Sequence, residues 1–511
     1  MINPMLHSLV IRATCAQSNP AIFNCSSINE LSSQQLLSDA LNVASNLENL
    51  NLKKGDHIVL TIPCSENFCK IVYGCFAVGC IPTLLDPATP EADLHECVRE
   101  LNPSLWISEQ PVEPFEVTPP STLLKNKIQE QPFEPVQIEP SDTCMMLYTT
   151  GTTGLPKGVP WASSQLLSHI QTQKNSYKKY DIRTEFVFFS HLAIFAIAMG
   201  RVAVIPDLEN TQPNLISIEH MLYQMKVYGS DYVFASPALW KRVSEHCEKS
   251  KKRIDFIKVI STAGASVNVK SLLKLKNNTD NASIYIPYAS TEVLMPICCI
   301  SLDDLEYLST KGLSSGKGIP LGCPSPDMNV EIISLDNQDT NKFLANNEIG
   351  QIVVSGPRVT TEYFKRPELT LNAKFKLSGN DDVWHKMGDV GYKDSNNVIW
   401  FLSRLKHVEK TSFGLMYPDC LEQYFNFHLD LHTSSLIYHK STGSLSLVIP
   451  ENLCKETEAR KIIKLCEDIK IPYINIVKFP SELPTDTRHN SKIDRGKISS
   501  WLSLEQLNRV I

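Results

Sequence analysis

Helix-like and strand-like segments alternate along the N-terminal half of the chain, and this alternation constrains the fold more than any other feature of the sequence. Apolar residues recur at helical spacing in residues 34–50 and 67–78, whereas residues 57–62 and 81–85 have the composition of strands. The alternation resumes with a strand at residues 143–148 and continues to about residue 300. Such a pattern predicts an α/β fold of layered sheets.

The rest of the chain predicts further subdivisions, because 511 residues exceed what one hydrophobic core normally serves. Residues 111–140 are rich in Pro, Gln and Glu and read as an irregular connection. Residues 348–400 read as short strands separated by turns, which indicates a β-rich subdomain at about residues 320–404. A small α/β segment follows it. We therefore expect an N-terminal domain at residues 1–404 and a C-terminal domain at residues 405–511.

Composition and charge favour a soluble globular protein, with 42% hydrophobic and 20% charged residues. The formal net charge of −6 gives no reason to expect nucleic acid or an anionic membrane as a partner. The most apolar stretch, Phe186–Pro206, contains His191, Gly200 and Arg201, and its uncharged part is short for a bilayer. We expect it to form a buried helix and strand that wall a pocket, so the chain is not expected to be an integral membrane protein.

The sequence holds 15 cysteines, but their spacing favours neither a metal site nor a set of disulfides. No Cys-x-x-Cys pair occurs, and Cys64, Cys69, Cys75 and Cys80 lie in a segment with helical apolar spacing. The odd number and the lack of an export signal at the N-terminus predict reduced thiols, most of them packed in the core. We therefore expect a cytoplasmic protein.

A run of glycines and threonines directly follows the strand at residues 143–148, and a helix is expected from about Ser163. Glycines let the backbone turn tightly, and exposed N–H groups in such a turn bind anions. The threonine hydroxyls add donors and the lysine adds a mobile charge, so the run predicts a grip on polyphosphate, although the spacing of a Walker loop is absent. The alternative is a glycine-rich surface turn. The candidate ATP-binding residues are Thr149, Thr150, Gly151, Thr152, Thr153, Gly154 and Lys157.

Two further motifs follow in order along the chain, Ala263-Gly264-Ala265 and Tyr288-Ala289-Ser290-Thr291-Glu292. Together with the glycine-threonine run they closely resemble the adenylate-forming superfamily of acyl-CoA synthetases, luciferases and peptide-synthetase adenylation domains. The resemblance implies that Ala263, Gly264 and Ala265 lie against adenine and that Tyr288 packs on it. It also implies that Thr291 binds the α-phosphate and that Glu292 holds Mg²⁺, a cation that prefers carboxylate and phosphate oxygens.

Later motifs extend the resemblance to the end of the chain. Lys386–Tyr392 resembles the family's Gly-Asp motif, which implies that Asp389 accepts hydrogen bonds from both ribose hydroxyls. Ser403–His407 resembles the hinge before a small mobile C-terminal domain, which implies that Arg404 contacts the ribose or a phosphate. Residues 483–495 resemble the motif of the adenylation lysine, so Lys492 would contact the substrate carboxylate and the α-phosphate.

The run Asp-x-Arg-His-Asn-x-Lys-Ile at residues 486–493 is unusual for CoA ligases and resembles the bacterial β-lactone synthetases of the long-chain olefin pathway. The likeness covers about residues 30–502. It implies that ATP activates a hydrophobic β-hydroxy acid, whose own hydroxyl then displaces AMP and closes a four-membered lactone. We hypothesise that His407 or His489 helps to remove the hydroxyl proton. The alternative is that both histidines only form local hydrogen bonds.

Several departures from the family pattern keep two other functions open. Phe413 stands where CoA-using members carry glycine, which argues against a pantetheine channel and mildly against an acyl-CoA synthetase. It says little about a ligase that passes the acyl group to a carrier protein. Serines replace glycines at Ser403 and Ser491, which gives some weight to a nucleotide-binding protein without catalysis. Against that last function stand the retained residues Lys157, Thr291, Glu292, Asp389, Arg404 and Lys492.

Overall fold

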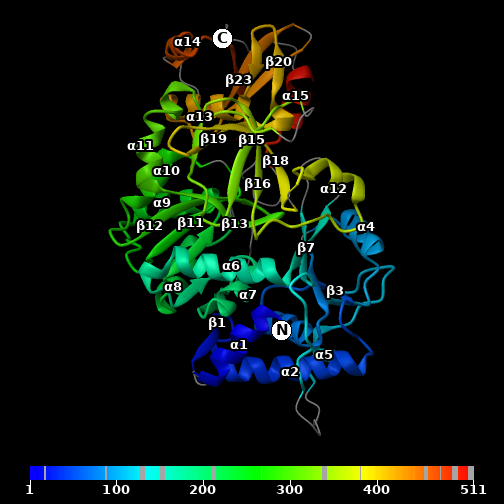
Figure 1. Cartoon of the computed structure of the whole chain (residues 1–511). Coiled ribbons are helices and arrows are strands. Elements are labelled where there is room, and N and C mark those ends of the chain that lie inside the picture. Colours follow the sequence, from blue (N-terminus) through cyan, green and yellow to red (C-terminus); the bar gives the residue numbers. More distant parts are fainter. Residues whose placement is uncertain are drawn as a thin grey trace.

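The computed structural model describes residues 1–15, 19–86, 89–125, 133–149, 156–208, 215–265, 267–336, 342–379, 381–440, 442–453, 458–471, 474–485 and 493–504. It is a mixed α/β protein in which sheets and helices follow one another from the N-terminal layers at one end to the C-terminal segment at the other (Figure 1). The predicted α/β class is confirmed.

The largest sheet has eight strands, and its central strands run parallel. In spatial order they are β13 (Val293–Ser301), β12 (Ser283–Ser290), β11 (Val259–Thr262), β10 (Tyr232–Ala235), β8 (Thr184–Phe186), β9 (Val202–Ile205), β1 (Pro20–Asn24) and β2 (Asn29–Ser32). Only the two edge strands, β13 and β2, pair antiparallel with their neighbours. Parallel strands share one direction, so the loops that follow β10, β11 and β12 meet at one edge.

A second sheet of five strands lies beside the first. Its order is β5 (Leu105–Ser108), β3 (His57–Thr61), β4 (Ile81–Leu84), β6 (Thr143–Thr149) and β7 (Lys157–Ala162). Strands β6 and β7 are antiparallel, with Thr149 opposite Lys157. The loop predicted to grip phosphate therefore joins two paired strands, whereas the sequence had indicated a turn that leads directly into a helix. The missed strand β7 contains Pro160 and begins with Lys-Gly, which weakens its strand signal.

Helices cover both sheets and share one large core between them. This core combines side chains of α1 (Pro4–Cys15), α2 (Ser33–Asn49), α3 (Glu66–Val78), α6 (Ser163–Ser176) and α7 (Ser190–Ala198). A second core lies under α8 (Ile218–Val227), α9 (Pro237–Ser250), α10 (Val269–Lys276) and α11 (Leu302–Ser309). The short helices α4 (Glu91–Leu101) and α5 (Pro120–Leu123) accompany the five-stranded sheet.

The helices predicted at residues 34–50 and 67–78 are confirmed as α2 and α3, and local chemistry explains their ends. The Ser65 hydroxyl accepts a hydrogen bond from the Phe68 N–H (3.1 Å), which caps the start of α3. The helix stops at Gly79, which takes a left-handed conformation with φ of 77°. The apolar stretch at residues 186–206 contains α7 and β9, as expected, and both are buried.

The β-rich subdomain is present and is an antiparallel sheet. Its strands are β14 (Ile319–Gly322), β19 (Ile399–Arg404), β18 (Val383–Lys393), β16 (Gly350–Ser355) and β15 (Asn329–Ile333), with β17 (Lys374–Lys376) paired to β18. The helix α12 (Pro367–Ala373) was not expected from the sequence. Val293 and Ile297 of β13 belong to the core of this sheet, so it is packed onto the edge of the eight-stranded sheet.

The C-terminal segment has its own sheets and cores. It comprises the hairpin β20 (Glu409–Thr411) and β21 (Gly414–Met416), the sheet β22 (Ser435–His439), β23 (Ser444–Pro450) and β24 (Ile474–Phe479), and the helices α13 (Pro418–Leu429), α14 (Glu458–Asp468) and α15 (Arg495–Leu504). Its cores contain only residues after 415. In Figure 1 it forms the orange and red layer beyond the β-rich sheet.

Three expectations from composition can be compared with the described residues. No helix among them is both long enough and apolar enough to cross a membrane. Each cysteine in the described ranges is free, and most are buried. No group of three or more candidate metal ligands of the His, Cys, Asp and Glu types occurs in this part of the chain.

Candidate active site

Two of the sequence motifs lie at the edge where the parallel strands of the large sheet end. Residues 263–265 follow β11 and Thr291 follows β12, and these strands are paired with Ser261 opposite Tyr285. Gly264 has a φ of 92° and is exposed, a conformation that favours glycine. Ligands of open α/β sheets bind at the carboxyl ends of the strands. This edge of the sheet therefore carries the backbone turn at residues 263–265 beside the motif that contains Tyr288 and Glu292.

Asp389 connects this edge to the β-rich subdomain. The Tyr288 hydroxyl donates a hydrogen bond to its Oδ2 (2.5 Å), and Arg404 Nη1 donates to its Oδ1 (2.7 Å). Asp389 and Arg404 are also opposite each other in the β18–β19 ladder. The structure thus brings together three residues that are far apart in the sequence and that were all predicted to contact the nucleotide.

The Asp389 carboxylate is almost completely buried, with 1% of the residue exposed, whereas the Arg404 side chain is 46% exposed. Burial raises the pKa of Asp389, and the charge of Arg404 and the Tyr288 hydrogen bond oppose that change. Gly388, just before it, has a φ of 70° and no neighbouring atoms where a side chain would stand. The arrangement holds one buried carboxylate within β18 through two hydrogen bonds.

Glu292 is the second carboxylate of the site. The Tyr363 hydroxyl donates a hydrogen bond to its Oε1 (2.6 Å), and Thr360 donates through both its N–H and its hydroxyl to the Glu292 carbonyl (3.0 Å each). Burial alone would raise the pKa of Glu292. The Tyr363 hydrogen bond and the charge of Lys374 are among the effects that lower it overall, so the carboxylate is ionised at neutral pH.

Behind Glu292 lie two buried titratable side chains that sequence reasoning missed. Lys374 is the only buried lysine among the described residues, and its ammonium donates to the Thr360 carbonyl (2.6 Å) and lies 3.4 Å from His385 Nδ1. Burial lowers the pKa of Lys374 to about 8, against the charge of Glu292. Burial, followed by the charge of Lys374, lowers the pKa of His385 to about 3, so its imidazole is neutral. No sequence signal distinguishes these two residues from other polar side chains of strands.

The phosphate loop is described only at its two flanks. Thr149 ends β6 and Lys157 starts β7, while Thr150, Gly151, Thr152, Thr153 and Gly154 lie outside the described residues. The Lys157 ammonium lies 4.9 Å from the centroid of the Tyr363 ring, whose hydroxyl binds Glu292. Trp161 of β7 donates from Nε1 to the Thr291 carbonyl (2.9 Å). The described residues that follow the loop, Lys157 and Trp161, therefore lie close to Glu292 and Thr291.

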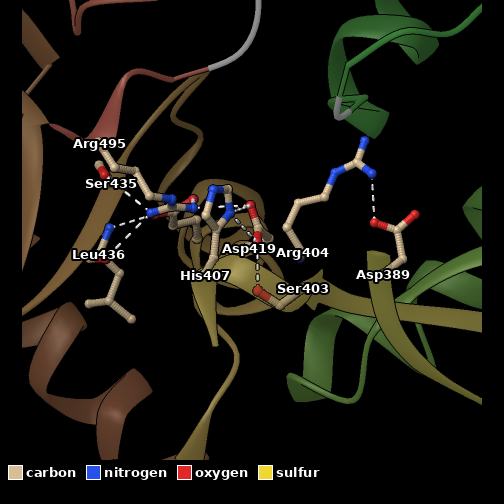
Figure 2. Close-up of polar contacts among 9 residues, drawn as sticks. Asp389, Ser403, Arg404, His407, Asp419, Ser435, Leu436 and Arg495 are labelled. Carbon is tan, nitrogen blue, oxygen red and sulfur yellow. Dashed lines mark hydrogen bonds and ion pairs between the residues drawn. The ribbon is translucent and has the colours of Figure 1, made fainter. Parts of the chain in front are cut away.

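A second polar cluster lies at the predicted hinge and is centred on Asp419 at the start of α13 (Figure 2). Its carboxylate accepts hydrogen bonds from the Ser403 hydroxyl (2.6 Å) and the Arg404 N–H (3.0 Å). It also contacts His407 Nδ1 (3.0 Å) and Arg495 Nη2 (3.0 Å). Burial alone would raise the pKa of Asp419, but the His407 hydrogen bond and the Arg495 charge lower it well below its usual range.

Arg495 extends this hinge cluster into the C-terminal segment. Its guanidinium forms a bidentate pair with Glu422, at 2.7 Å for Nη2 to Oε2; the Glu422 side chain is buried and the Arg495 side chain is 16% exposed. Thr485 and Ile493 pair in an isolated bridge, so both flanks of the adenylation-lysine motif are fixed. His489 and Lys492 themselves lie outside the described residues. Sequence reasoning missed Asp419 and Arg495.

Three residues that the sequence singled out, His407, Phe413 and Ser403, have clear structural positions. His407 is half-buried and hydrogen-bonded to Asp419, which is the kind of local contact that the sequence left open beside proton transfer. Phe413 is 41% exposed in the turn of the β20–β21 hairpin, where its N–H donates to the Thr411 hydroxyl (3.3 Å). Ser403, which replaces the usual glycine, is buried and donates to Asp419.

Comparison with known proteins agrees with this geometry. A family model described as AMP-binding enzyme matches residues 11–364. The chain is 26% identical over 503 residues to an olefin beta-lactone synthetase of Xanthomonas campestris pv. campestris, covering 91% of this chain and 89% of that protein. It is also 26% identical over 509 residues to an olefin beta-lactone synthetase of Stenotrophomonas maltophilia, covering 92% and 90%.

Solved structures show the same fold. The O-succinylbenzoate coenzyme A synthetase of Bacillus subtilis, in complex with ATP and a magnesium ion, superposes with a TM-score of 0.76 at 17% identity, covering 96% of this chain and 99% of that one. The family model spans more than half of the chain and includes the phosphate loop and the β12–β13 turn. The chain therefore belongs to the AMP-binding enzyme family and is an adenylate-forming ligase.

Proposed function

We propose that the protein joins a hydrophobic β-hydroxy acid to AMP with release of pyrophosphate, and then closes the acyl adenylate to a β-lactone. The observation that carries the proposal is that Tyr288, Asp389 and Arg404 form one hydrogen-bonded group, while Tyr363 links Lys157 to Glu292. Similarity to olefin beta-lactone synthetases over about nine tenths of the chain supports the choice of acid.

The nucleotide roles follow from the chemistry at the strand ends. Ala263, Gly264 and Ala265 offer a flat backbone surface to adenine, and Tyr288 packs its ring on the base. Asp389 accepts hydrogen bonds from the ribose hydroxyls, and Arg404 donates a hydrogen bond to the ribose. The phosphate loop, including Thr149 and Lys157, holds the polyphosphate, and Thr291 contacts the α-phosphate. These assignments are part of the proposal.

Glu292 fits a magnesium ion that bridges the phosphates. Its carboxylate is ionised and fixed by the Tyr363 hydroxyl at Oε1, which leaves Oε2 without a hydrogen bond from Tyr363. Magnesium prefers carboxylate and phosphate oxygens and is usually held by one or two carboxylates plus the phosphates of the substrate. When bound it would neutralise charge as pyrophosphate leaves. Glu292 would hold the ion, and Lys157 would contact the phosphates from the opposite side.

Replacing Glu292 by glutamine should raise the magnesium requirement at least about tenfold, because the side chain keeps its shape but loses the anionic ligand. The measurement is a magnesium titration of ATP–pyrophosphate exchange. Glu331→Gln is the matched control. It removes the charge of a carboxylate whose ion-pair partner is Lys393 (2.5 Å), and both residues belong to the β-rich subdomain. A Glu292→Gln enzyme with the parental magnesium dependence would refute the assignment.

We assign the acyl chain to the side of α7. Leu192 and Phe195 of this helix, with Met199, Phe234 and Met295, form the apolar part of the lining of a cavity of about 20 Å³. Its other lining residues are polar: His169, Gln173, Glu185, Arg201 and Tyr232. The Phe195 ring packs against Trp161 (centroids 5.8 Å apart), and Trp161 hydrogen-bonds the Thr291 carbonyl, so the cavity lies close to the reacting end of the site. This volume holds about one water molecule, so an alkyl chain requires these side chains to rotate apart.

The second step needs no partner besides the substrate. The β-hydroxyl oxygen attacks the acyl carbonyl carbon, the bond between that carbon and the AMP oxygen breaks, and the hydroxyl proton passes to a base. A hydroxyl held beside the carbonyl reacts by proximity once water and CoA are excluded. His407 and His489 remain our candidates for the base. Phe413 in the hairpin after the hinge argues against a pantetheine channel, although it leaves a carrier protein as an alternative acceptor.

We further propose that residues 405–511 act as a lid whose motion about Arg404 delivers Lys492. Closure of this kind is absorbed by a few residues at the ends of elements. The cores of the C-terminal segment contain only its own residues, which suits a unit that moves as a body.

Product analysis by mass spectrometry tests the proposed function directly. The purified protein with ATP, Mg²⁺ and a long-chain β-hydroxy acid should yield AMP and a β-lactone in the absence of CoA. A product that forms only with CoA or an acyl carrier protein would make the chain a ligase of that acceptor. No AMP from a broad panel of acids would show a nucleotide-binding protein without catalysis.

A further inference from the structure

The Asp389 carboxylate has more acceptor capacity than the protein uses. An ionised carboxylate offers about four lone-pair positions on its two oxygens. In the structure Arg404 takes one position on Oδ1 and the Tyr288 hydroxyl takes one on Oδ2. The described residues leave two positions, one on each oxygen, which is the number that the two hydroxyls of a ribose need.

The direction of those two free positions depends on how the carboxylate is turned. The torsion between the Cβ and the carboxylate of an aspartate is soft, so a single hydrogen bond does not fix the plane of the group. Arg404 holds one oxygen from the same subdomain, since β18 and β19 are paired. Tyr288 holds the other oxygen from β12 of the eight-stranded sheet. The two donors together fix the plane from two different sheets.

We propose that the Tyr288 hydroxyl is a positioning group that sets the Asp389 carboxylate to receive both ribose hydroxyls. This inference rests on the proposed function, in which Asp389 binds the ribose. It separates two roles of one residue: the ring of Tyr288 packs on adenine, and its hydroxyl determines selectivity for the ribose. A phenylalanine at this position would keep the first role and lose the second.

The electrostatic environment agrees with this role. Tyr288 is hydrogen-bonded to a carboxylate that is 1% exposed, where water does not replace a lost donor. Burial, followed by the charge of Asp389, raises the pKa of Tyr288 well above its usual value, so its hydroxyl keeps the proton that it donates. The donor is therefore present throughout the pH range in which the enzyme is assayed.

The test compares ATP with 2′-deoxy-ATP and 3′-deoxy-ATP by calorimetric binding, which requires no knowledge of the acid substrate. The ratio of the deoxy-nucleotide Kd to the ATP Kd is the penalty for losing one ribose hydroxyl. In Tyr288→Phe we expect the ATP Kd to rise by about tenfold, and at least one of the two penalties to fall severalfold. Binding of ATP by the variant also shows that it is folded.

Tyr285→Phe is the matched control, because it removes a hydroxyl from the same strand. The Tyr285 hydroxyl pairs with that of Tyr180 (2.6 Å), whereas the Tyr288 hydroxyl donates to Asp389, so both penalties should stay parental. Parental penalties in Tyr288→Phe would overturn the inference whatever happens to the ATP Kd, since a lost stacking contact changes all three nucleotides equally. If the parent enzyme itself shows no penalty for either deoxy-nucleotide, the ribose assignment of Asp389 in the proposed function fails, and this inference fails with it.

Discussion

Lys492→Ala should reduce adenylate formation by at least about 10²–10³-fold while leaving ATP binding mostly intact. The lysine is assigned to the carboxylate and the α-phosphate, two groups whose charges must approach before the in-line displacement. A cation placed between them stabilises the transition state more than bound ATP, because the repulsion is greatest when the new bond forms. The loss should therefore appear in the rate of ATP–pyrophosphate exchange and hardly in the Kd of ATP.

The flanks of this lysine make the experiment specific. Thr485 pairs with Ile493, and Arg495 binds Glu422 and Asp419, so a single alanine at position 492 leaves the anchors of the segment in place. Lys497→Ala is the control, because Lys497 is 64% exposed on α15 and forms a surface ion pair with Asp494 (3.4 Å). Its exchange rate should equal that of the parent. Normal turnover in Lys492→Ala would identify the segment as a solvated basic tail.

Much of the fold was predictable because its signals are local. The periodicity of α2 and α3 and the alternation with β3 and β4 depend on residues within one element, and the helix and strand around residues 186–206 are apolar throughout. Strand β7 was missed because it contains Pro160 and begins with Lys-Gly, and it is stabilised by its pairing with β6. The helix α12, which includes no buried residue, likewise has no core-facing stripe to predict it.

The candidate site likewise contains residues that the sequence could locate and residues that it could not. Tyr288, Glu292, Asp389 and Arg404 stand in motifs that resemblance can locate, and the structure brings the first, third and fourth into one hydrogen-bonded group. Residues that act through tertiary contacts carry no such signal. Tyr363 reaches Glu292 across 71 positions, and Arg495 reaches Glu422 across 73, so neither partnership can be inferred from spacing.

The substitution of serine for glycine at position 403 shows how a sequence departure changes meaning in the structure. Read alone, Ser403 gives weight to a chain without catalysis, because it breaks the family pattern at the hinge. In the structure its buried hydroxyl donates a hydrogen bond to the Asp419 carboxylate (2.6 Å), which also accepts one from the Arg404 N–H. The side chain adds a contact at the hinge, so this position no longer argues against activity. No contact of the described residues gives a comparable reason for Phe413.

Asp419→Asn should destabilise the protein by about 3–5 kcal/mol, because Asp419 is a buried anion and the exchange leaves the charge of Arg495 partly uncompensated. The carboxylate now accepts hydrogen bonds from the Ser403 hydroxyl and the Arg404 N–H. The amide of asparagine would place a donor group there, opposite these two donors. Chemical unfolding at pH 7 is the measurement. Asp181→Asn is the control, since Asp181 forms an exposed pair with Arg183 (2.8 Å), and its stability should stay parental.

The acid dependence of the same variant gives a second, independent readout. The folded-state pKa of Asp419 is lowered below the usual value near 3.9, so its stabilising contribution is present above about pH 4 and is lost as the pH falls through the folded-state pKa. The stability difference between the parent and Asp419→Asn should therefore be full at pH 7 and shrink on acidification below about pH 4. A difference that is small at pH 7, or that stays constant into acid, would show that the Asp419 charge does not hold the hinge to the C-terminal segment.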